Sequence, residues 1–179
     1  MADLTIALAG NPNAGKTTIF NILTGLHQHT GNWPGKTVEK KEGEIEHDGV
    51  TIKIVDLPGT YSLTAYSPEE IIARDFIIEE KPDVIINVVD ATNLERNLYL
   101  TVQLLELGVP LIMALNMTDA LHKDGARIDL NHLSQLLGNT PIVQTAANRE
   151  RGISELLSKT LKMNRKRKTH REYKVKVRA

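Results

Sequence analysis

Cysteine is absent from the 179-residue chain, and aromatic residues make up only 4% of it. Without thiols the chain has no disulfide framework and no thiolate metal site. This composition is compatible with the reducing cytoplasm. Long apolar runs are also missing: stretches such as residues 84–89 fall far short of the roughly 20 residues that span a membrane. The six histidines show no metal-ligand spacing. What remains, 41% apolar and 25% charged residues, is typical of one globular domain.

The formal net charge is zero, but the charges are unevenly distributed along the chain. Residues 1–158 carry 12 Lys/Arg against 21 Asp/Glu, whereas residues 159–179 carry 10 Lys/Arg against Glu172 alone. We interpret this segment as a helix end followed by a linker, with contact to anionic lipid heads or to RNA phosphates as alternatives. Tyr173 is the only aromatic residue among these basic residues, so few side chains are available to stack on bases. RNA binding is therefore disfavoured, and no DNA partner is expected. The predicted division is a domain of residues 1–163 and a basic linker or tail of residues 164–179.

Apolar strands and amphipathic helices alternate along the chain. Strands are predicted at residues 4–9, 39–47, 50–55, 84–90, 111–116 and 142–145, with helices at 16–26, from Pro68, and at 94–107, 130–137 and 153–163. Asp48-Gly49 is a strong hairpin signal, and residues 27–41 are expected to form a polar loop. The prediction is an α/β fold, a six-stranded, mostly parallel sheet with one antiparallel strand and helices on both faces. Ligands in such sheets bind at the carboxyl ends of the strands.

The stretch that follows the first strand is a complete phosphate-binding loop. Residues 10–17 read GNPNAGKT and fit the pattern G-x-x-x-x-G-K-[ST] between a strand and a helix. In this pattern backbone N–H groups surround phosphate oxygens, Lys16 reaches the β- and γ-phosphates, and Thr17 is placed to ligate Mg²⁺. The candidate nucleotide-binding residues here are Gly10, Asn11, Pro12, Asn13, Ala14, Gly15, Lys16, Thr17 and Thr18.

A second phosphate element, D-x-x-G, ends the third predicted strand. Asp56 can hold Mg²⁺ through a water molecule, and the Gly59 N–H can meet the γ-phosphate. Thr37, in the long loop before the second strand, can add a hydroxyl ligand to Mg²⁺ and sense the γ-phosphate. Thr17, Thr37 and Asp56 are therefore the candidate magnesium ligands.

Base recognition is predicted in the loops after the fifth and sixth strands. Asn116, Met117 and Asp119 fit N-[KM]-x-D, and a carboxylate at Asp119 can accept hydrogen bonds from N1–H and the 2-amino group of guanine, a donor pair that adenine lacks. Met117 replaces the usual Lys but can still pack on a purine. Thr145, Ala146 and Ala147 take the place of a further guanine-binding element, usually S-A-x, with only backbone N–H contact left to the base.

Together these motifs resemble the translation-factor-related class of P-loop GTPases, which have a Ras-like fold. The run from Gly31 to Gly43, GNWPGKTVEKKEG, extends the resemblance to the N-terminal G domain of the FeoB family, the bacterial ferrous iron transporters. It covers about residues 3–160. In that family a helical domain and a polytopic membrane domain follow the G domain.

The resemblance also suggests how catalysis proceeds without the glutamine that many G proteins place after D-x-x-G, where this chain has Thr60. FeoB-like G domains can use K⁺ beside the phosphates as an activating positive charge. The resemblance assigns the Asn13 side chain and backbone carbonyls near Gly31 and Trp33 to that ion. Lys16, Asn13, Thr37 and Gly59 are the candidate catalytic residues.

The resemblance implies a GTPase that binds GTP and GDP and regulates or drives ferrous iron uptake. Because no glutamine follows D-x-x-G and no arginine is an evident finger in cis, the intrinsic rate is expected to be slow. The expected partners of the GTPase are the helical and membrane domains of a parent protein, with an oligomer through the parent left open. The chain is expected in the cytoplasm, with the parent at the cytoplasmic face of the bacterial inner membrane. The alternatives are a nucleotide-dependent binding module and an RNA- or ribosome-associated GTPase.

Overall fold

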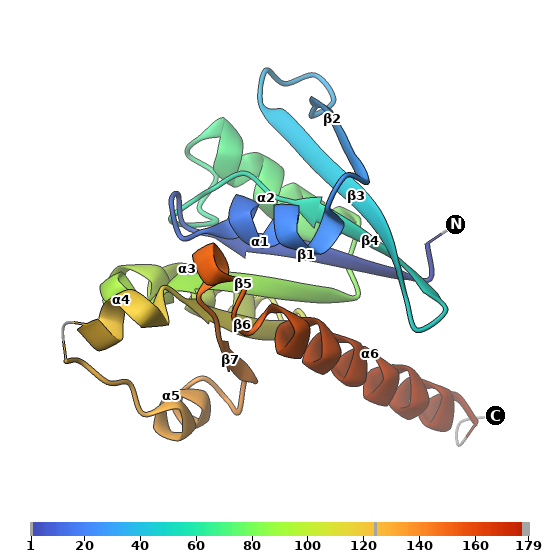
Figure 1. Ribbon diagram of the computed structural model, residues 1–179. Helices are drawn as coiled ribbons and strands as arrows, with labels where there is room; N and C mark the ends of the chain where they lie inside the picture. Colours follow the sequence, from blue (N-terminus) through green and yellow to red (C-terminus); the bar gives the residue numbers. More distant parts are fainter. Residues whose placement is uncertain (1, 124, 177–179) are drawn as a thin grey trace.

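The computed structural model describes residues 2–123 and 125–176. Over these residues seven strands form one sheet in the order β2-β3-β4-β1-β5-β6-β7 (Figure 1). The strands are β1 (Leu4–Gly10), β2 (Gln28–Asn32), β3 (Glu39–His47), β4 (Val50–Asp56), β5 (Val84–Asp90), β6 (Leu111–Asn116) and β7 (Ile142–Gln144). The helices are α1 (Lys16–Thr24), α2 (Pro68–Glu79), α3 (Leu94–Glu106), α4 (Thr118–Lys123), α5 (Leu130–Leu136) and α6 (Ile153–Lys176), with short 3-10 turns η1 (Ala91–Asn93) and η2 (Ala147–Arg149).

The sheet confirms the predicted class and corrects its strand count. β3 is antiparallel to both neighbours, β2 and β4, and the other pairs are parallel. The prediction of six strands was wrong because β2 lies in the stretch expected to be a loop. Its sequence, QHTGN, is polar and largely exposed, so it carries no alternating hydrophobic signal. It pairs through backbone hydrogen bonds with β3, from Gln28 opposite Gly43 to Asn32 opposite Glu39.

Alternate residues of the central strands face opposite layers of helices. From β1, Leu4, Ile6 and Leu8 join a core with residues of α1 and α6. Ala7 and Ala9 face the other way, into a core with residues of α2 and α3. A third cluster lies between α3, α4, α5 and the ends of β5 and β6. Both faces of the parallel strands are therefore buried, which explains their nearly continuous apolar sequences.

The remaining differences from the sequence prediction concern helices. The short helix α4 was not predicted. α6 does not end at residue 163 but continues as one helix to Lys176 (Figure 1). The basic composition of its last turns allows a helix, because Lys and Arg have high helix propensity. The parallel strands β1, β4, β5, β6 and β7 all end at one edge of the sheet, where the predicted functional loops follow.

Candidate nucleotide-binding site

The loop between β1 and α1 has the backbone that a phosphate cradle requires. Gly15 caps α1 with φ 92°, and a side chain there would clash with the Asn116 amide. Gly10 lies against β5, where an added Cβ would stand 2.5 Å from the Val88 carbonyl oxygen. Asn13 also has a positive φ, 64°. These turns curl the loop at the N-terminus of α1, a geometry that favours anions.

Lys16 and Thr17, at the start of α1, both contact the aspartate that ends β4. The Lys16 Nζ lies 2.7 Å from Asp56 Oδ1, and both side chains are buried. The Thr17 hydroxyl donates to Asp56 Oδ2 at 3.0 Å. The structure thus joins the predicted phosphate lysine to two of the three predicted magnesium ligands, although Asp56 follows Lys16 by 40 residues.

A cavity of about 560 Å³ lies over this loop, within the size range of small-molecule sites. Its lining joins the D-x-x-G turn and the base-recognition loop to the phosphate loop: Asn11, Pro12, Asn13, Gly15, Lys16, Thr17, Thr18, Gly59 and Met117. Gly59 packs closely, since a Cβ on it would lie 3.2 Å from Pro12 Cα. The predicted phosphate elements therefore form one concave surface.

Thr60, the residue after Gly59, does not take the place of the glutamine that other G proteins have at this position. The Thr60 N–H donates to the Gly10 carbonyl at 3.2 Å, and its hydroxyl donates to the Ser62 carbonyl at 2.6 Å. Thr60 is buried, with 4% of its surface exposed. Both the N–H and the hydroxyl hydrogen of Thr60 are thus engaged by backbone carbonyls, so Thr60 is poorly placed to orient a water molecule.

Asn116 joins three loops at the carboxyl edge of the sheet. Its Nδ2 donates to the Ala14 carbonyl at 2.9 Å, while its Oδ1 accepts from the Thr145 hydroxyl at 3.1 Å and from the Ala147 N–H at 3.0 Å. The side chain is buried. Because the buried Asn116 amide makes three hydrogen bonds, it fixes the phosphate loop, the end of β6 and the loop after β7 relative to one another. Thr145 and Ala147, predicted as base contacts, are held by it.

Asp119 lies in the first turn of α4, with 13% of its side chain exposed. Its Oδ2 lies 3.2 Å from Arg149 Nε and accepts a long bond from Asn148 Nδ2 at 3.5 Å. Partial burial acts to raise the pKa of Asp119, but the Asn148 hydrogen bond, the Arg149 charge and local N–H groups outweigh it, so the pKa lies below that of an ordinary aspartate. The carboxylate is therefore ionised near neutral pH, as recognition of two N–H donors requires.

Sequence reasoning missed Asn148 and Arg149 as neighbours of Asp119. They lie in η2, about 30 residues further along the chain. A signal was available, because two polar side chains follow directly after the predicted base-recognition residues Thr145, Ala146 and Ala147 at the same edge of the sheet. Polar loop residues are so common, however, that this signal is weak on its own.

Four predicted ligands, the described residues Gly31, Trp33, Thr37 and Asp56, do not line this cavity, although Asp56 contacts Lys16 and Thr17, which do. Gly31 is in the edge strand β2, and Thr37 is exposed in the turn before β3. Trp33 is buried against α2, with its ring 5.6 Å from Phe76 in an edge-to-face arrangement. Its Nε1 meets no hydrogen-bond partner among the described residues. The roles of Gly31, Trp33 and Thr37 as Mg²⁺ and K⁺ ligands stay predictions that require this segment to move.

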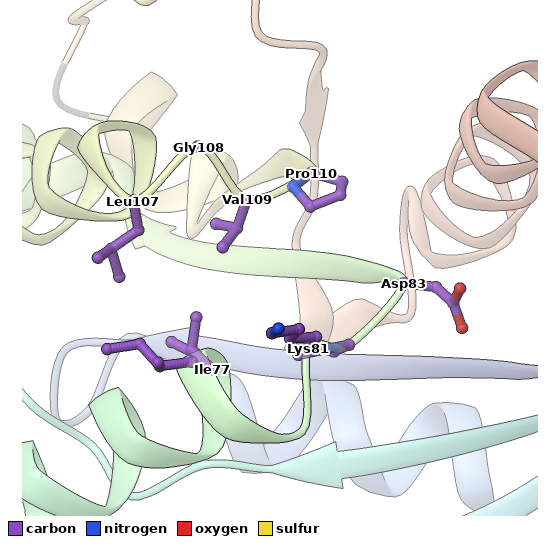
Figure 2. A pocket seen from close by; sticks show the side chains of 9 residues that line it. Ile77, Lys81, Asp83, Leu107, Gly108, Val109 and Pro110 are labelled. Carbon is purple, nitrogen blue, oxygen red and sulfur yellow. The ribbon is translucent and has the colours of Figure 1, made fainter. Parts of the chain in front are cut away.

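A separate cavity of about 430 Å³ lies between the end of α2 and the turn joining α3 to β6. Figure 2 shows Ile77 and Lys81 on one side and Leu107 and Val109 on the other. It contains none of the predicted site residues. Within the described part of the chain no cluster of three or more His, Asp or Glu could hold a metal ion. Nor does any helix in that part have the length and apolar character to cross a bilayer.

The doubly covered sheet, the phosphate loop and the aspartates that end β4 and begin α4 define a P-loop G domain of Ras-like fold. The particular family follows from comparison with known proteins. The family model of ferrous iron transport protein B, FeoB_N, matches residues 4–160, and the chain belongs to this family.

Individual relatives agree with this assignment. The Fe(2+) transporter FeoB of Salmonella typhimurium is 55% identical over 160 residues, covering 87% of this chain and 21% of the relative. The FeoB G-domain of Methanococcus jannaschii has a TM-score of 0.81 and 50% identity, covering 92% of this chain and 99% of that one. The cytosolic domain of T. maritima FeoB in a GDP form has a TM-score of 0.86 and 44% identity, covering 90% and 63%. The chain spans about a fifth of the length of the full transporters it matches.

Proposed function

We propose that the chain binds GTP and hydrolyses it to GDP and phosphate. The observation that carries this proposal is the Asn116 amide, which ties the loop around Lys16 to the loop that presents Asp119. A phosphate cradle and a carboxylate able to read guanine are thereby fixed on one edge of the sheet. The GDP form of the T. maritima relative supports a guanine nucleotide as the ligand.

Magnesium fits the oxygen donors beside the phosphate loop. Thr17 and Asp56 present a hydroxyl and a carboxylate 3.0 Å apart, and Mg²⁺ prefers such hard ligands together with phosphate oxygens. Bound there, Mg²⁺ would neutralise charge on the β- and γ-phosphates. Lys16 would exchange part of its contact with Asp56 for the phosphates, and Thr37 would complete the ligand set when its loop moves toward the cavity.

Without a water-orienting glutamine, catalysis is expected to rely more strongly on positive charge beside the phosphates. Asn13 lines the cavity on a left-handed turn of the phosphate loop, where its amide oxygen can serve K⁺. The carbonyls of Gly31 and Trp33 would join it only after Trp33 leaves the face of α2. We expect slow hydrolysis that K⁺ stimulates, because a cation at this place stabilises developing charge in the transition state.

The biological role follows from the family. The relatives of full length are named as Fe(2+) transporters, and this chain corresponds to their cytosolic G domain. We propose that GTP turnover in this domain regulates or drives ferrous iron uptake through helical and polytopic membrane domains of a parent protein. The domain would lie on the cytoplasmic side of the bacterial inner membrane, and residues 164–179 would lead toward the helical domain.

The test is hydrolysis of GTP and of ATP by the purified chain with Mg²⁺, in matched K⁺ and Na⁺ buffers. GTP should be hydrolysed in preference to ATP, and K⁺ should raise the rate severalfold or more. Asn13→Ala should remove the difference between the two salts while GDP binding persists. Asn131→Ala, which changes an exposed amide of α5, is the matched control and should behave as the native chain.

Two results would contradict parts of this proposal separately. Equal rates in K⁺ and Na⁺ would refute the potassium site and leave the GTPase assignment intact. Nucleotide binding without turnover in either salt would point instead to a binding module, and tighter binding of ATP than of GTP would overturn the role given to Asp119.

A further inference from the structure

The carboxylate assigned to guanine recognition is already contacted by side chains of the chain itself. Arg149 Nε lies 3.2 Å from Asp119 Oδ2, and Asn148 Nδ2 lies 3.5 Å from the same atom. Both residues come from η2, the turn after β7. We propose that Arg149, assisted by Asn148, competes with the guanine base for Asp119 and thereby weakens guanine-nucleotide binding and accelerates release. This inference rests on the proposed function.

The ion pair and the hydrogen bond engage the same carboxylate that guanine requires. Oδ2 of Asp119 accepts a hydrogen bond from Asn148 and lies 3.2 Å from Arg149 Nε, its ion-pair partner. Guanine brings its N1–H and 2-amino donors to the two oxygens of the same group. A guanine donor directed at Oδ2 therefore competes with both the Asn148 hydrogen bond and the Arg149 charge. Arg149 is the stronger competitor, because its contact with Asp119 is the shorter one and belongs to an ion pair of which one partner is largely buried.

The loop that carries Arg149 is held firmly, so the competing side chain is delivered to a defined place. The Ala147 N–H donates to Asn116, and Ala146 pairs with Arg151 in a backbone bridge. Gly152 packs so tightly against the Gln144 carbonyl that no side chain fits there. The Arg149 side chain itself is 45% exposed. It can therefore swing into solvent without any rearrangement of this backbone.

In this arrangement we expect Arg149 to affect recognition of the base and not binding of the phosphates. It is not among the residues that line the cavity over the phosphate loop, which include Lys16 and Asn13. Its removal is therefore expected to change nucleotide affinity through Asp119 only. A residue that merely supported the fold would alter binding of every nucleotide and lower the stability of the domain.

The experiment measures affinity and dissociation of fluorescently labelled GDP for the whole chain by stopped flow. Arg149→Gln removes the charge and keeps a long polar side chain. We expect the dissociation rate to fall, and the affinity to rise, by roughly two- to fivefold, the size of effect that a partly exposed ion pair produces. Asn148→Ala should act in the same direction with a smaller effect. Arg151→Gln is the matched control, since it lies in the same loop and forms no ion pair among the described residues.

A second measurement separates competition from structural effects. In an Asp119→Asn background, which replaces the guanine-reading carboxylate by an amide suited to xanthine, dissociation of xanthosine diphosphate is measured with and without Arg149→Gln. The effect of Arg149→Gln should shrink to less than twofold, because its charged partner is gone. Thermal unfolding of each variant shows whether it is folded, and Arg149→Met, which also removes the charge and keeps a long side chain, replaces Arg149→Gln if that variant is unstable.

The outcomes distinguish this inference from the proposed function. Weaker GDP binding by Arg149→Gln would mean that Arg149 supports the base site, and an effect equal to that of Arg151→Gln would mean that it has no part in binding. Either result overturns the inference while the native chain still binds GDP. If the native chain binds no guanine nucleotide, the proposed function itself fails.

Discussion

The ammonium group of Lys16 and the carboxylate of Asp56 form a buried ion pair, 2.7 Å apart, between the first turn of α1 and the end of β4. Each charge is compensated mainly by the other, with the Thr17 hydroxyl as a further donor to Asp56. The pair therefore links the two elements that are assigned to phosphate and to magnesium. Removal of one partner leaves the other charge buried without compensation.

Lys16→Met should destabilise the domain as well as abolish phosphate binding. The methionine retains most of the side-chain volume, but Asp56 loses its counter-charge, and we expect a loss of about 3 kcal/mol in the free energy of unfolding. Urea denaturation measures it. Lys162→Met, an exposed position on α6, should change stability by less than about 0.5 kcal/mol.

The double variant Lys16→Met/Asp56→Asn provides the check on this explanation. It should recover part of the stability that Lys16→Met loses, because the uncompensated charge is gone. A double variant that is less stable than Lys16→Met would show that the ion pair is not the source of the effect.

The loop between β4 and α2 depends on the ionised form of Glu70. Hydrogen bonds from the Ser62 hydroxyl, at 2.7 Å, and from the Tyr66 N–H, at 2.9 Å, lower the pKa of Glu70 from its ordinary value of 4.5. Because the folded-state pKa is the lower one, ionised Glu70 contributes stability above about pH 5, and this contribution is lost as the pH falls through the folded-state pKa.

Glu70→Gln tests this pH dependence. The native chain should be more stable than the variant near pH 7, by less than about 1 kcal/mol because solvent screens the site, and the difference should shrink below pH 4.5. Chemical denaturation at several pH values measures it. Glu69→Gln serves as control, since it removes an acid from the same first turn of α2. A difference that does not change with pH would contradict the assignment.

Trp33 is the only tryptophan, so its fluorescence reports on one place in the fold. Its ring is buried against Phe76, with Lys40 Nζ 5.2 Å from the ring centre. If Thr37 reaches Mg²⁺ as proposed, Trp33 has to leave this site. A non-hydrolysable GTP analogue with Mg²⁺ and K⁺ should then shift its emission to longer wavelength.

Phe76→Ala provides the comparison for this measurement. It removes the aromatic partner, so the emission should lie at longer wavelength before any nucleotide is added. GDP with Mg²⁺ should cause less change in the native chain, because it lacks the γ-phosphate that Thr37 is proposed to sense. Emission that stays constant on addition of the GTP analogue would contradict movement of this segment.

The fold could be predicted from the sequence because its strong elements carry strong local signals. The phosphate loop has fixed spacing, and the buried strands are apolar and bounded by turn residues. β2 could not be predicted, since it lies at the edge of the sheet and its polar residues pair only through the backbone with β3. In the same way, the contact of Arg149 with Asp119 depends on tertiary placement of two loops. The family resemblance assigns the Trp33 carbonyl to the nucleotide site, whereas the side chain is buried against α2.

Asn116 and the loop after β7 have a mechanical consequence through helix α6. The helix begins at Ile153, next to Gly152 in the loop that Asn116 holds, and its 24 residues make a rod about 36 Å long. A tilt of about 5° at the base-recognition loop would displace the far end of such a rod by about 3 Å. With the proposed base site next to its start, α6 would act as a lever that converts a small change at that site into a larger displacement at its far end, where a following domain would sense it.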